Sequence, residues 1–240
     1  MIEGFDIMKQ TKGKCHFCNK EYTKAGMLRH FATCSSRIEP NAGKVSTKQS
    51  GSFILNITYK YDKAYWLIVA CKEETMLKDL DKFLRDIWLE CCGHLSSFNI
   101  AGTSFDSSTG GGMMGFWGEP PKSMNHSLKK VLEKGLKICY EYDFGSTTDL
   151  IITVSDYCLE HLGKDKITLI SRNNPVEHTC SECGTRVAKV ICGACSYTGN
   201  GYVCDKCEEV HECDDFALLP ICNSPRCGVC GYTGSTIYGD

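Results

Sequence analysis

The spacing of the cysteines constrains the fold of this chain more than any other feature. The sequence has 240 residues and 18 cysteines, of which three lie before residue 35 and ten lie from Cys180 onward. In a reducing compartment, cysteines at Cys-x-x-Cys spacing bind metal ions more often than they form disulfides. We therefore expect small metal-stabilised modules at the two ends of the chain, with one ordinary core between them.

The N-terminal cysteines follow a zinc-finger pattern. Cys15 and Cys18 are followed by His30 and, four positions later, by Cys34. A Cys-x-x-Cys turn and a helix with ligands at i and i+4 supply four donors in a tetrahedral arrangement. Residues 12–37 therefore predict one Cys2His-Cys zinc finger. Because so short a segment cannot bury a core, we expect the metal to supply most of its folding free energy.

This predicted finger is basic. Residues 12–37 contain six lysines and arginines but a single acid, Glu21. Basic side chains on a finger can neutralise phosphates, and the candidates for nucleic-acid contact are Lys20, Lys24 and Arg29. The alternative is a protein-binding knuckle whose charges only face solvent, because one finger alone reads few bases.

A polar segment without periodicity, residues 38–51, predicts a linker between the finger and a central domain at residues 52–176. The central domain is expected to be α+β, with an antiparallel sheet and two helices. SFILNITYK and KAYWLIVAC predict a hairpin, and three further strands are expected from KICYEYDFG, TDLIITVSDYC and KITLISR. Helical spacing predicts one helix from a cap at Thr75 to Trp88 and a second over residues 125–134.

Two other features of the central region carry less chemistry. The glycine-rich stretch at residues 102–121 predicts a long loop, but it lacks the Gly-Lys-Ser/Thr ending of a phosphate-binding loop. Five scattered cysteines form no Cys-x-x-Cys pair, and we interpret them as small buried hydrophobic residues: Cys71, Cys91, Cys92, Cys139 and Cys158.

Three stretches of the central domain carry a family resemblance. They are YWLIVACKEETMLKDLDKFLRDIW, GHLSSFNIAG and YEYDFGSTTDLIITV. Together they resemble the plasmid Ri ORF-3-like family, which includes TnpR-type passenger proteins of insertion elements. The residues that match the recurring features are Trp88, His94, Leu95, Phe98, Tyr140, Tyr142, Asp143, Phe144 and Gly145. The resemblance covers about half of the chain and implies a fold and a mobile-element or plasmid origin, without an assigned reaction.

The chain departs from this family directly after Gly145. Relatives commonly carry an acid, a Trp and a His there, whereas this chain has Ser146, Thr147 and Thr148. The remaining candidates for acid–base work are His94, Glu141 and Asp143. An enzyme of unknown reaction with its site near these three residues is the alternative to a binding protein, although a lone histidine and an aspartate beside a glycine are more often structural.

The C-terminal module, residues 177–240, contains a ladder of paired donors. The pairs are Cys180 with Cys183, Cys192 with Cys195, Cys204 with Cys207, and His211 with Cys213. Eight donors suffice for two four-coordinate zinc ions, so about three zinc ions are expected in the whole chain. A cross-brace would join the first pair to the third and the second to the fourth, whereas sequential ribbons would join neighbouring pairs. The short gap between the first two pairs favours the cross-brace.

Three cysteines beyond this ladder leave alternatives open. The tail also resembles that of many proteins of the same family, in which the Cys230 position is regular while those of Cys222 and Cys227 usually hold Val and Met. The resemblance implies that Cys230 belongs to the module, where it could displace Cys192 or Cys213. Alternatively, Cys222, Cys227 and Cys230 could hold a further zinc with His178 or water.

The donor sets predict structural rather than catalytic metal. Catalytic zinc keeps three protein ligands and a water, while sulfur-rich sets of four disfavour Lewis-acid chemistry. No His-x-Glu motif precedes a Pro-Cys-x-x-Cys, which excludes the deaminase pattern. From Cys180 onward the sequence contains eight acidic and four basic residues. This negative charge makes the module better suited to a protein partner than to phosphates.

These observations predict a zinc-binding, non-enzymatic protein that interacts with nucleic acid or protein. The net charge of −2 indicates no polyanionic partner for the chain as a whole. The first ten residues lack the apolar segment of a signal peptide, and no apolar run approaches the about 18 residues of a membrane span, so we expect a cytoplasmic location.

Overall fold

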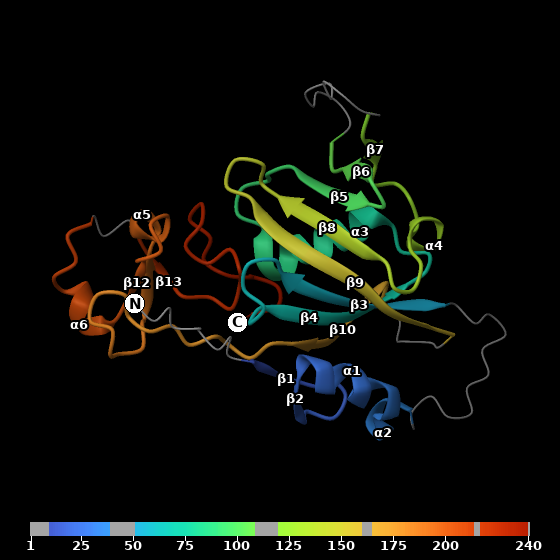
Figure 1. Cartoon of the computed structure of the whole chain (residues 1–240), viewed down its shortest axis with the longest axis horizontal. Coiled ribbons are helices and arrows are strands. Elements are labelled where there is room, and N and C mark those ends of the chain that lie inside the picture. The colour runs from blue at the N-terminus through green and yellow to red at the C-terminus, as the bar shows by residue number, and fades with distance from the viewer. Residues whose placement is uncertain (1–9, 39–50, 109–119, 160–164, 214–216, 240) are drawn as a thin grey trace, which may run out of the picture. The chain divides into compact units, whose positions relative to one another are not determined.

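The computed structural model describes residues 10–38, 51–108, 120–159, 165–213 and 217–239. The chain divides into two compact units. The first comprises residues 1–76, 126–139 and 149–174, and the second comprises residues 77–125, 140–148 and 175–240. The structure is a mixed α/β fold dominated by sheets (Figure 1). None of the described helices is long and apolar enough to cross a membrane.

Four strands of the first unit lie in the order β10-β4-β3-β9. They are β3 (Ser52–Tyr59), β4 (Trp66–Lys72), β9 (Thr148–Cys158) and β10 (Ile167–Arg172). All three pairings are antiparallel. The predicted hairpin is confirmed, because β3 and β4 pair along their whole length from Ser52 opposite Lys72 to Thr58 opposite Trp66.

The run of apolar residues in β4 is buried on both faces of the sheet. Side chains alternate along a strand, so Trp66, Ile68 and Ala70 share one face, while Leu67 and Val69 share the other. The first face packs against Met27 and Phe31 of the N-terminal region, and the second lies in the core with no exposed surface. A strand covered on both sides needs a continuous apolar run, as this sequence has.

The N-terminal region is a small ββα module that packs on this sheet. It contains β1 (Lys12–Lys14), β2 (Glu21–Thr23), α1 (Lys24–Thr33) and the one-turn α2 (Ser35–Ile38). Figure 1 shows these elements together, coloured blue. The helix buries Met27 completely and Phe31 almost completely, each worth about 1.5–3 kcal/mol. The module was expected to lack a core of its own, and the structure shows that the sheet supplies one. The predicted linker lies mostly outside the described residues.

Four further strands lie in the order β8-β5-β6-β7: β8 (Lys137–Tyr142), β5 (Ser96–Ile100), β6 (Thr103–Asp106) and β7 (Lys122–Ser123). The second unit contains the last three and residues 140–142 of β8. Strands β5 and β6 are antiparallel, but β6 and β7 are parallel. The expected sheet is therefore not antiparallel throughout. Strand β6 occupies the start of the predicted glycine-rich loop, much of whose remainder lies outside the described residues.

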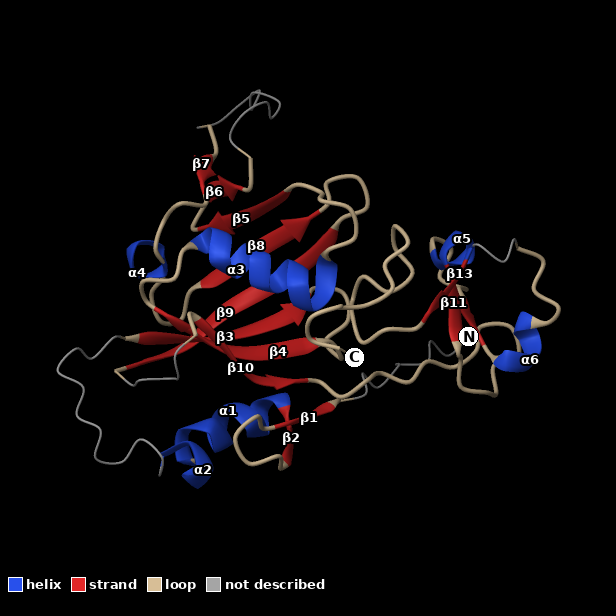
Figure 2. Ribbon diagram, turned by 180° about the vertical axis from the view of Figure 1, so that it is seen from behind, coloured by secondary structure: helices blue, strands red, loops and turns tan. Residues whose placement is uncertain are grey.

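The helices also differ from the two α-helices predicted for the central domain, because they are shorter and one continues as a π-helical turn. The described residues contain six α-helices, of which α3 (Leu77–Leu84) and the one-turn α4 (Leu128–Val131) fall in the predicted central domain. Residues Arg85–Leu89 continue α3 as a π-helical turn, η2. Thr75 does not cap α3, because its hydroxyl donates to the Lys166 carbonyl at 3.0 Å. Figure 2 shows α3 against the face of β5 and β8.

A buried carboxylate fixes α3 to these strands. Asp81 accepts hydrogen bonds from Tyr140 at 2.7 Å, from Ser96 at 2.5 Å and from Arg85 at 2.8 Å. Burial, together with the Asp81 charge, raises the pKa of Tyr140 well above its usual value, so this phenol stays a donor. Three partners satisfy a carboxylate that would otherwise be costly to bury. This network positions the end of the helix, from which the following turn begins.

The C-terminal region of the second unit is built on short elements. Strands β12 (Tyr202–Val203), β11 (Val190–Cys192) and β13 (Leu218–Pro220) form an antiparallel sheet with β11 in the middle. Two one-turn helices, α5 (Gly193–Ser196) and α6 (Asp205–Glu208), follow Cys192 and Cys204 directly. Such small elements bury few side chains, so their arrangement depends on other cross-links.

Candidate metal centres

Four groups of cysteine and histidine side chains converge among the described residues. Within each group the four donor atoms all lie within 4.8 Å of one another. For a tetrahedral ion with metal–sulfur bonds of about 2.3 Å, the sulfur–sulfur edges would be about 3.8 Å. Each group could therefore hold one metal ion, and the sulfur-rich donor sets are consistent with zinc.

The finger cluster consists of Cys15, Cys18, His30 and Cys34. The thiols of Cys15 and Cys34 lie 4.0 Å apart, and the Cys18 thiol lies 3.2 Å from Nε2 of His30. The β1–β2 turn places the first pair, since the Asn19 amide donates to the Cys15 carbonyl at 2.8 Å with Asn19 in the left-handed region. Helix α1 carries His30, and Cys34 is its C-terminal cap.

Neighbouring groups hold the finger cluster in place. Tyr22 stacks on the His30 ring with centroids 4.2 Å apart, which fixes the orientation of that ligand. Gly13 allows β1 to approach β10, because a Cβ there would collide with the Arg172 carbonyl oxygen. The Cys15 thiol is buried, and this burial raises its pKa to about 11 without a metal. A bound cation would instead favour the thiolate.

The C-terminal module contains two interleaved clusters. The first cross-brace cluster joins Cys180 and Cys183 to Cys204 and Cys207. The second cross-brace cluster joins Cys192 and Cys195 to His211 and Cys213. The structure thus brings the first pair to the third and the second to the fourth, which is the cross-brace arrangement. Cys192 and Cys213 both stay in this module, so Cys230 displaces neither of them.

Polar contacts tune the ligands of both clusters. The Thr185 hydroxyl donates to the Cys183 sulfur at 3.5 Å, and with two backbone amides it lowers the pKa of Cys183 to about 6. Nδ1 of His211 contacts the Glu182 carboxylate, which leaves Nε2 facing the Cys195 sulfur at 3.8 Å. A carboxylate on the outer ring nitrogen fixes the tautomer that a metal needs. Glu182 thereby links the first cysteine pair to the ligands of the other cluster.

A fourth cluster was missed by the sequence analysis. Cys91, Cys92 and His94 follow η2 directly, and Cys230 from the C-terminal tail joins them. The expectation that the five central cysteines are buried holds for Cys71 only. Cys92 and Cys139 are exposed, while Cys91 and Cys158 are half-buried. The sequence signal was a Cys-Cys-x-His run with three donors in four residues, together with a C-terminal cysteine left over from the ladder.

The other tail cysteines lie in a small apolar core. Cys222 and Cys227 are buried with Ile191 and Tyr232, and the Cys91 side chain packs against them. The Cys222 amide donates to the Cys227 sulfur at 3.4 Å. Neither residue belongs to any cluster found among the described residues, and His178 stacks on Tyr202. The alternative of a zinc bound by Cys222, Cys227 and Cys230 is therefore not the arrangement that the structure has.

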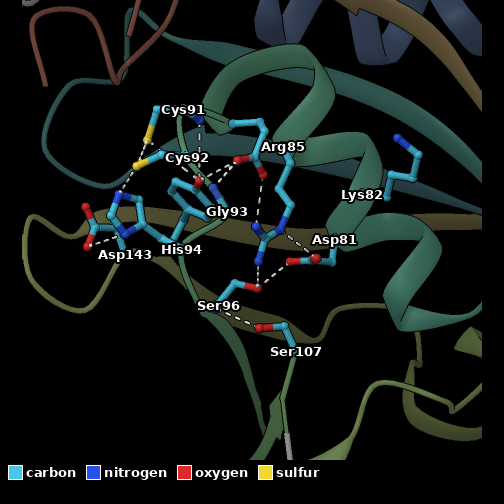
Figure 3. Close-up of polar contacts among 12 residues, drawn as sticks. Asp81, Lys82, Arg85, Cys91, Cys92, Gly93, His94, Ser96, Ser107 and Asp143 are labelled. Atoms are coloured by element: carbon cyan, nitrogen blue, oxygen red, sulfur yellow. Dashed lines mark hydrogen bonds and ion pairs between the residues drawn. The ribbon is translucent and has the colours of Figure 1, made fainter. Parts of the chain in front are cut away.

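The candidates for acid–base chemistry converge only in part. Nδ1 of His94 lies 3.5 Å from the Asp143 carboxylate, as Figure 3 shows. Glu141 does not join them: its side chain is exposed and alternates along β8 with the buried Tyr140 and Tyr142. Asp143 is 6% exposed, and Arg226 donates to its other oxygen at 2.6 Å. Although burial opposes ionisation, the Arg226 hydrogen bond holds the pKa of Asp143 below its usual range.

The predicted nucleic-acid contacts differ in their surroundings. Lys20 and Arg29 are exposed, as are Lys12 and Lys14 on β1. Lys24 is half-buried, and its ammonium donates to the Thr58 hydroxyl at 3.3 Å. Burial and the nearby charge of Lys63 lower the pKa of Lys24. The basic surface of the finger is thus the β1–β2 hairpin more than the helix.

Comparisons with known proteins add little to this geometry. No protein-family model matches the chain, and no curated protein matches it. Among solved structures, it is similar to the crystal structure of a protein of unknown function from Methanosarcina mazei Go1. The TM-score is 0.43 and the identity 17%, over 53% of this chain and 72% of that chain. A similarity at this level leaves the function to be argued from the residues themselves.

Proposed function

We propose that this chain is a zinc-dependent binding protein that contacts nucleic-acid phosphates through the basic surface of its N-terminal finger. The proposal includes zinc as the metal of the finger and of both cross-brace clusters. It also includes the mobile-element or plasmid origin that the resemblance to the plasmid Ri ORF-3-like family implies. The observation that carries it is the set of exposed lysines on the finger, Lys12, Lys14 and Lys20.

Saturated donor sets favour binding over metal catalysis. The finger and both cross-brace clusters each offer four cysteine or histidine donors, and none includes a carboxylate. Catalytic zinc keeps an open position for water, and four protein ligands leave none. In the central region, Asp143 is committed to Arg226 in a buried ion pair, which removes it as a candidate base. These features support structural metal and a function in recognition.

A cavity beside the finger supports anion binding. It has a volume of about 250 Å³ and lies where α1 begins. The described residues that line it include Lys24 and Lys63, with Thr11 and Thr23, and none of them carries a carboxylate. The two lysine ammonium groups make the described lining of this cavity electropositive, and β1 carries two further exposed lysines. A phosphate backbone is the macromolecular ligand that such a surface suits best.

The helix of the finger is poorly placed to read bases. Its face with Met27 and Phe31 packs on the sheet, and Arg37 is buried where it donates to the Phe31 carbonyl at 2.9 Å. Its exposed residues are Ala25, Arg29, Ala32 and Thr33. Two of these are alanines, and the Thr33 hydroxyl donates to the His30 carbonyl at 3.4 Å, which leaves Arg29 as the main candidate for a base contact. Contacts to phosphates without base readout position a protein but give little sequence specificity. We therefore expect binding that depends on salt more than on sequence.

The test replaces the three exposed lysines together, as Lys12→Gln, Lys14→Gln and Lys20→Gln. Binding of a fluorescent DNA duplex and a single-stranded RNA of equal length is measured over a range of salt concentrations. For duplex DNA, each lysine that neutralises a phosphate contributes about 0.9 to the slope of log K against log salt, so the slope of the triple variant should be smaller by about two to three. Affinity at low salt should fall at least tenfold.

The matched control carries Lys129→Gln, Lys130→Gln and Lys137→Gln, three exposed lysines outside the finger. It has the same net charge as the test variant, and it should bind as the wild type does. Equal binding by both triple variants would refute contact through the finger. The acidic C-terminal module would then be the better candidate surface, for protein, because Val210 and Tyr197 are 74% and 70% exposed beside ligands of its second cluster.

A further inference from the structure

The fourth cluster has the geometry of a metal site. Nε2 of His94 lies 2.9 Å from the Cys92 sulfur and 3.4 Å from the Cys230 sulfur. The sulfurs of Cys92 and Cys230 are 3.6 Å apart, and those of Cys91 and Cys92 are 3.8 Å apart. The two sulfur–sulfur separations and the Cys230–His94 separation match the edges of a tetrahedron around zinc, about 3.8 Å between sulfurs and about 3.5 Å from sulfur to nitrogen, while the Cys92–His94 separation is shorter.

The backbone at both ends of the site is shaped to present these donors. Gly93, between Cys92 and His94, has φ +77°, and its amide donates to the Glu90 carboxylate at 2.5 Å. Cys230 itself has φ +53°, a left-handed conformation that is unfavourable for a residue with a Cβ. A strained ligand backbone persists where other bonds compensate for it, and a bound metal would do so.

Side chains outside the cluster fix the histidine. Nδ1 of His94 faces the Asp143 carboxylate at 3.5 Å, so Nε2 is the nitrogen directed at the sulfurs (Figure 3). The other oxygen of Asp143 accepts from Arg226, whose side chain is completely buried. A carboxylate behind a histidine ligand is the usual outer support of a zinc site. Here an arginine anchors that carboxylate in turn.

The fourth ligand comes from a tail that lies along α3 and η2. The Ser224 hydroxyl donates to the Trp88 carbonyl at 2.6 Å, and the Ser235 hydroxyl donates to the Asp86 carbonyl at 2.6 Å. The Tyr238 ring meets Phe83 edge to face at 5.4 Å. In the sequence, Cys230 lies between Ser224 and Ser235. A metal bound at the fourth cluster would therefore cross-link this C-terminal tail to the turn before β5, which carries Cys91, Cys92 and His94.

We propose that Cys91, Cys92, His94 and Cys230 bind a fourth zinc ion that clamps the C-terminal tail to the turn after η2 and that exchanges more readily than the other three. Exchange follows from exposure. Cys92 and Cys230 are exposed. Each of the other three clusters has at least one completely buried cysteine: Cys15 in the finger, and Cys204 and Cys192 in the two cross-brace clusters. A chelator can approach the exposed thiolates without opening the fold.

The experiment is native mass spectrometry of the full chain, purified and exchanged into zinc-containing volatile buffer. Wild type should carry four zinc ions. Cys230→Ser and His94→Ala should each carry three, and Cys139→Ser, which replaces an exposed cysteine outside every cluster, should carry four. Three ions on wild type, or four on both ligand variants, would overturn the proposal. Three ions on wild type would still leave the proposed function standing, because the finger and cross-brace would be filled.

Two further measurements cover variants that fold poorly. In wild type, titration with a chelator should remove one ion at a lower chelator concentration than the rest, with unchanged far-ultraviolet circular dichroism. Asp143→Asn should weaken that one ion by about 10–100-fold in the same titration. Removal of all ions in a single step would contradict an exchangeable site. A wild-type mass lower by two hydrogens, with the disulfide placed at Cys92 by peptide mapping, would contradict the proposal.

Discussion

Cys204→Ser should cost the chain two metal ions, not one. Cys204 is completely buried and belongs to the first cross-brace cluster. The loop between Cys195 and His211, both ligands of the second cluster, contains Cys204 and Cys207. Strand β12 ends immediately before Cys204 and pairs with β11, which ends at Cys192. Releasing the first ion therefore frees the segment that sets the spacing of the second cluster.

The expected magnitude follows from the size of the module. Structural zinc contributes about 10–16 kcal/mol of apparent binding free energy in small domains, more than a core of short strands can replace. We expect native mass spectrometry of Cys204→Ser to show two fewer zinc ions than wild type, with the finger still occupied. Cys139→Ser is the control and should keep the full number. Loss of a single ion would mean that the two clusters fold independently, as sequential ribbons would.

Removing the buried arginine of the tail should have the second large effect. Arg226 donates to Asp143 at 2.6 Å and to the Ser146 carbonyl and Thr148 hydroxyl, both at 3.0 Å. Its guanidinium also lies over the Tyr142 ring, 4.8 Å from the centroid. Arg226→Met would leave the Asp143 carboxylate buried without its partner, which typically costs about 3–5 kcal/mol.

Denaturant unfolding in zinc-containing buffer measures this cost as a shift in midpoint. The double variant Arg226→Met with Asp143→Asn should be more stable than Arg226→Met alone, because no unpaired charge remains buried. Arg186→Met, at an exposed arginine of the same module, should change stability by less than about 0.5 kcal/mol. If the double variant is no more stable than Arg226→Met, the lost stability of Arg226→Met comes from lost packing and not from the unpaired Asp143 carboxylate.

The spacing of the cysteines allowed the metal clusters at the two ends of the chain to be predicted from the sequence. Cysteines three positions apart chelate locally, so the finger donors and the cross-brace pairs could be named before their positions were known. Two β-rich runs separated by a short turn likewise predicted the β3–β4 hairpin. Neither argument could place Cys230 with Cys91, because those residues are far apart in sequence and only the fold of the tail along α3 brings them together. The same is true of Arg226 and Asp143.

Other errors arose where tertiary contacts override local patterns. The apolar spacing from Leu77 to Trp88 predicted one regular helix, but the second half forms a π-helical turn that ends at the Glu90 amide bonding to the Arg85 carbonyl at 2.9 Å. The finger was expected to bury no core, yet Met27 and Phe31 pack on β4. The general tendency of cysteine to be buried predicted core positions for the five central cysteines, but four of them are half-buried or exposed, because such a tendency cannot identify any single residue.

The central claim is that each metal ion in this protein has four cysteine or histidine ligands and a structural role. Zinc K-edge X-ray absorption of the purified chain tests this claim most directly. The four clusters offer thirteen sulfur and three nitrogen donors. We predict an average of four ligands per ion, more than three of them sulfur at about 2.3 Å and the remainder nitrogen at about 2.0 Å. A spectrum with about two sulfurs per ion, or with an oxygen ligand that bound anions displace, would contradict the account.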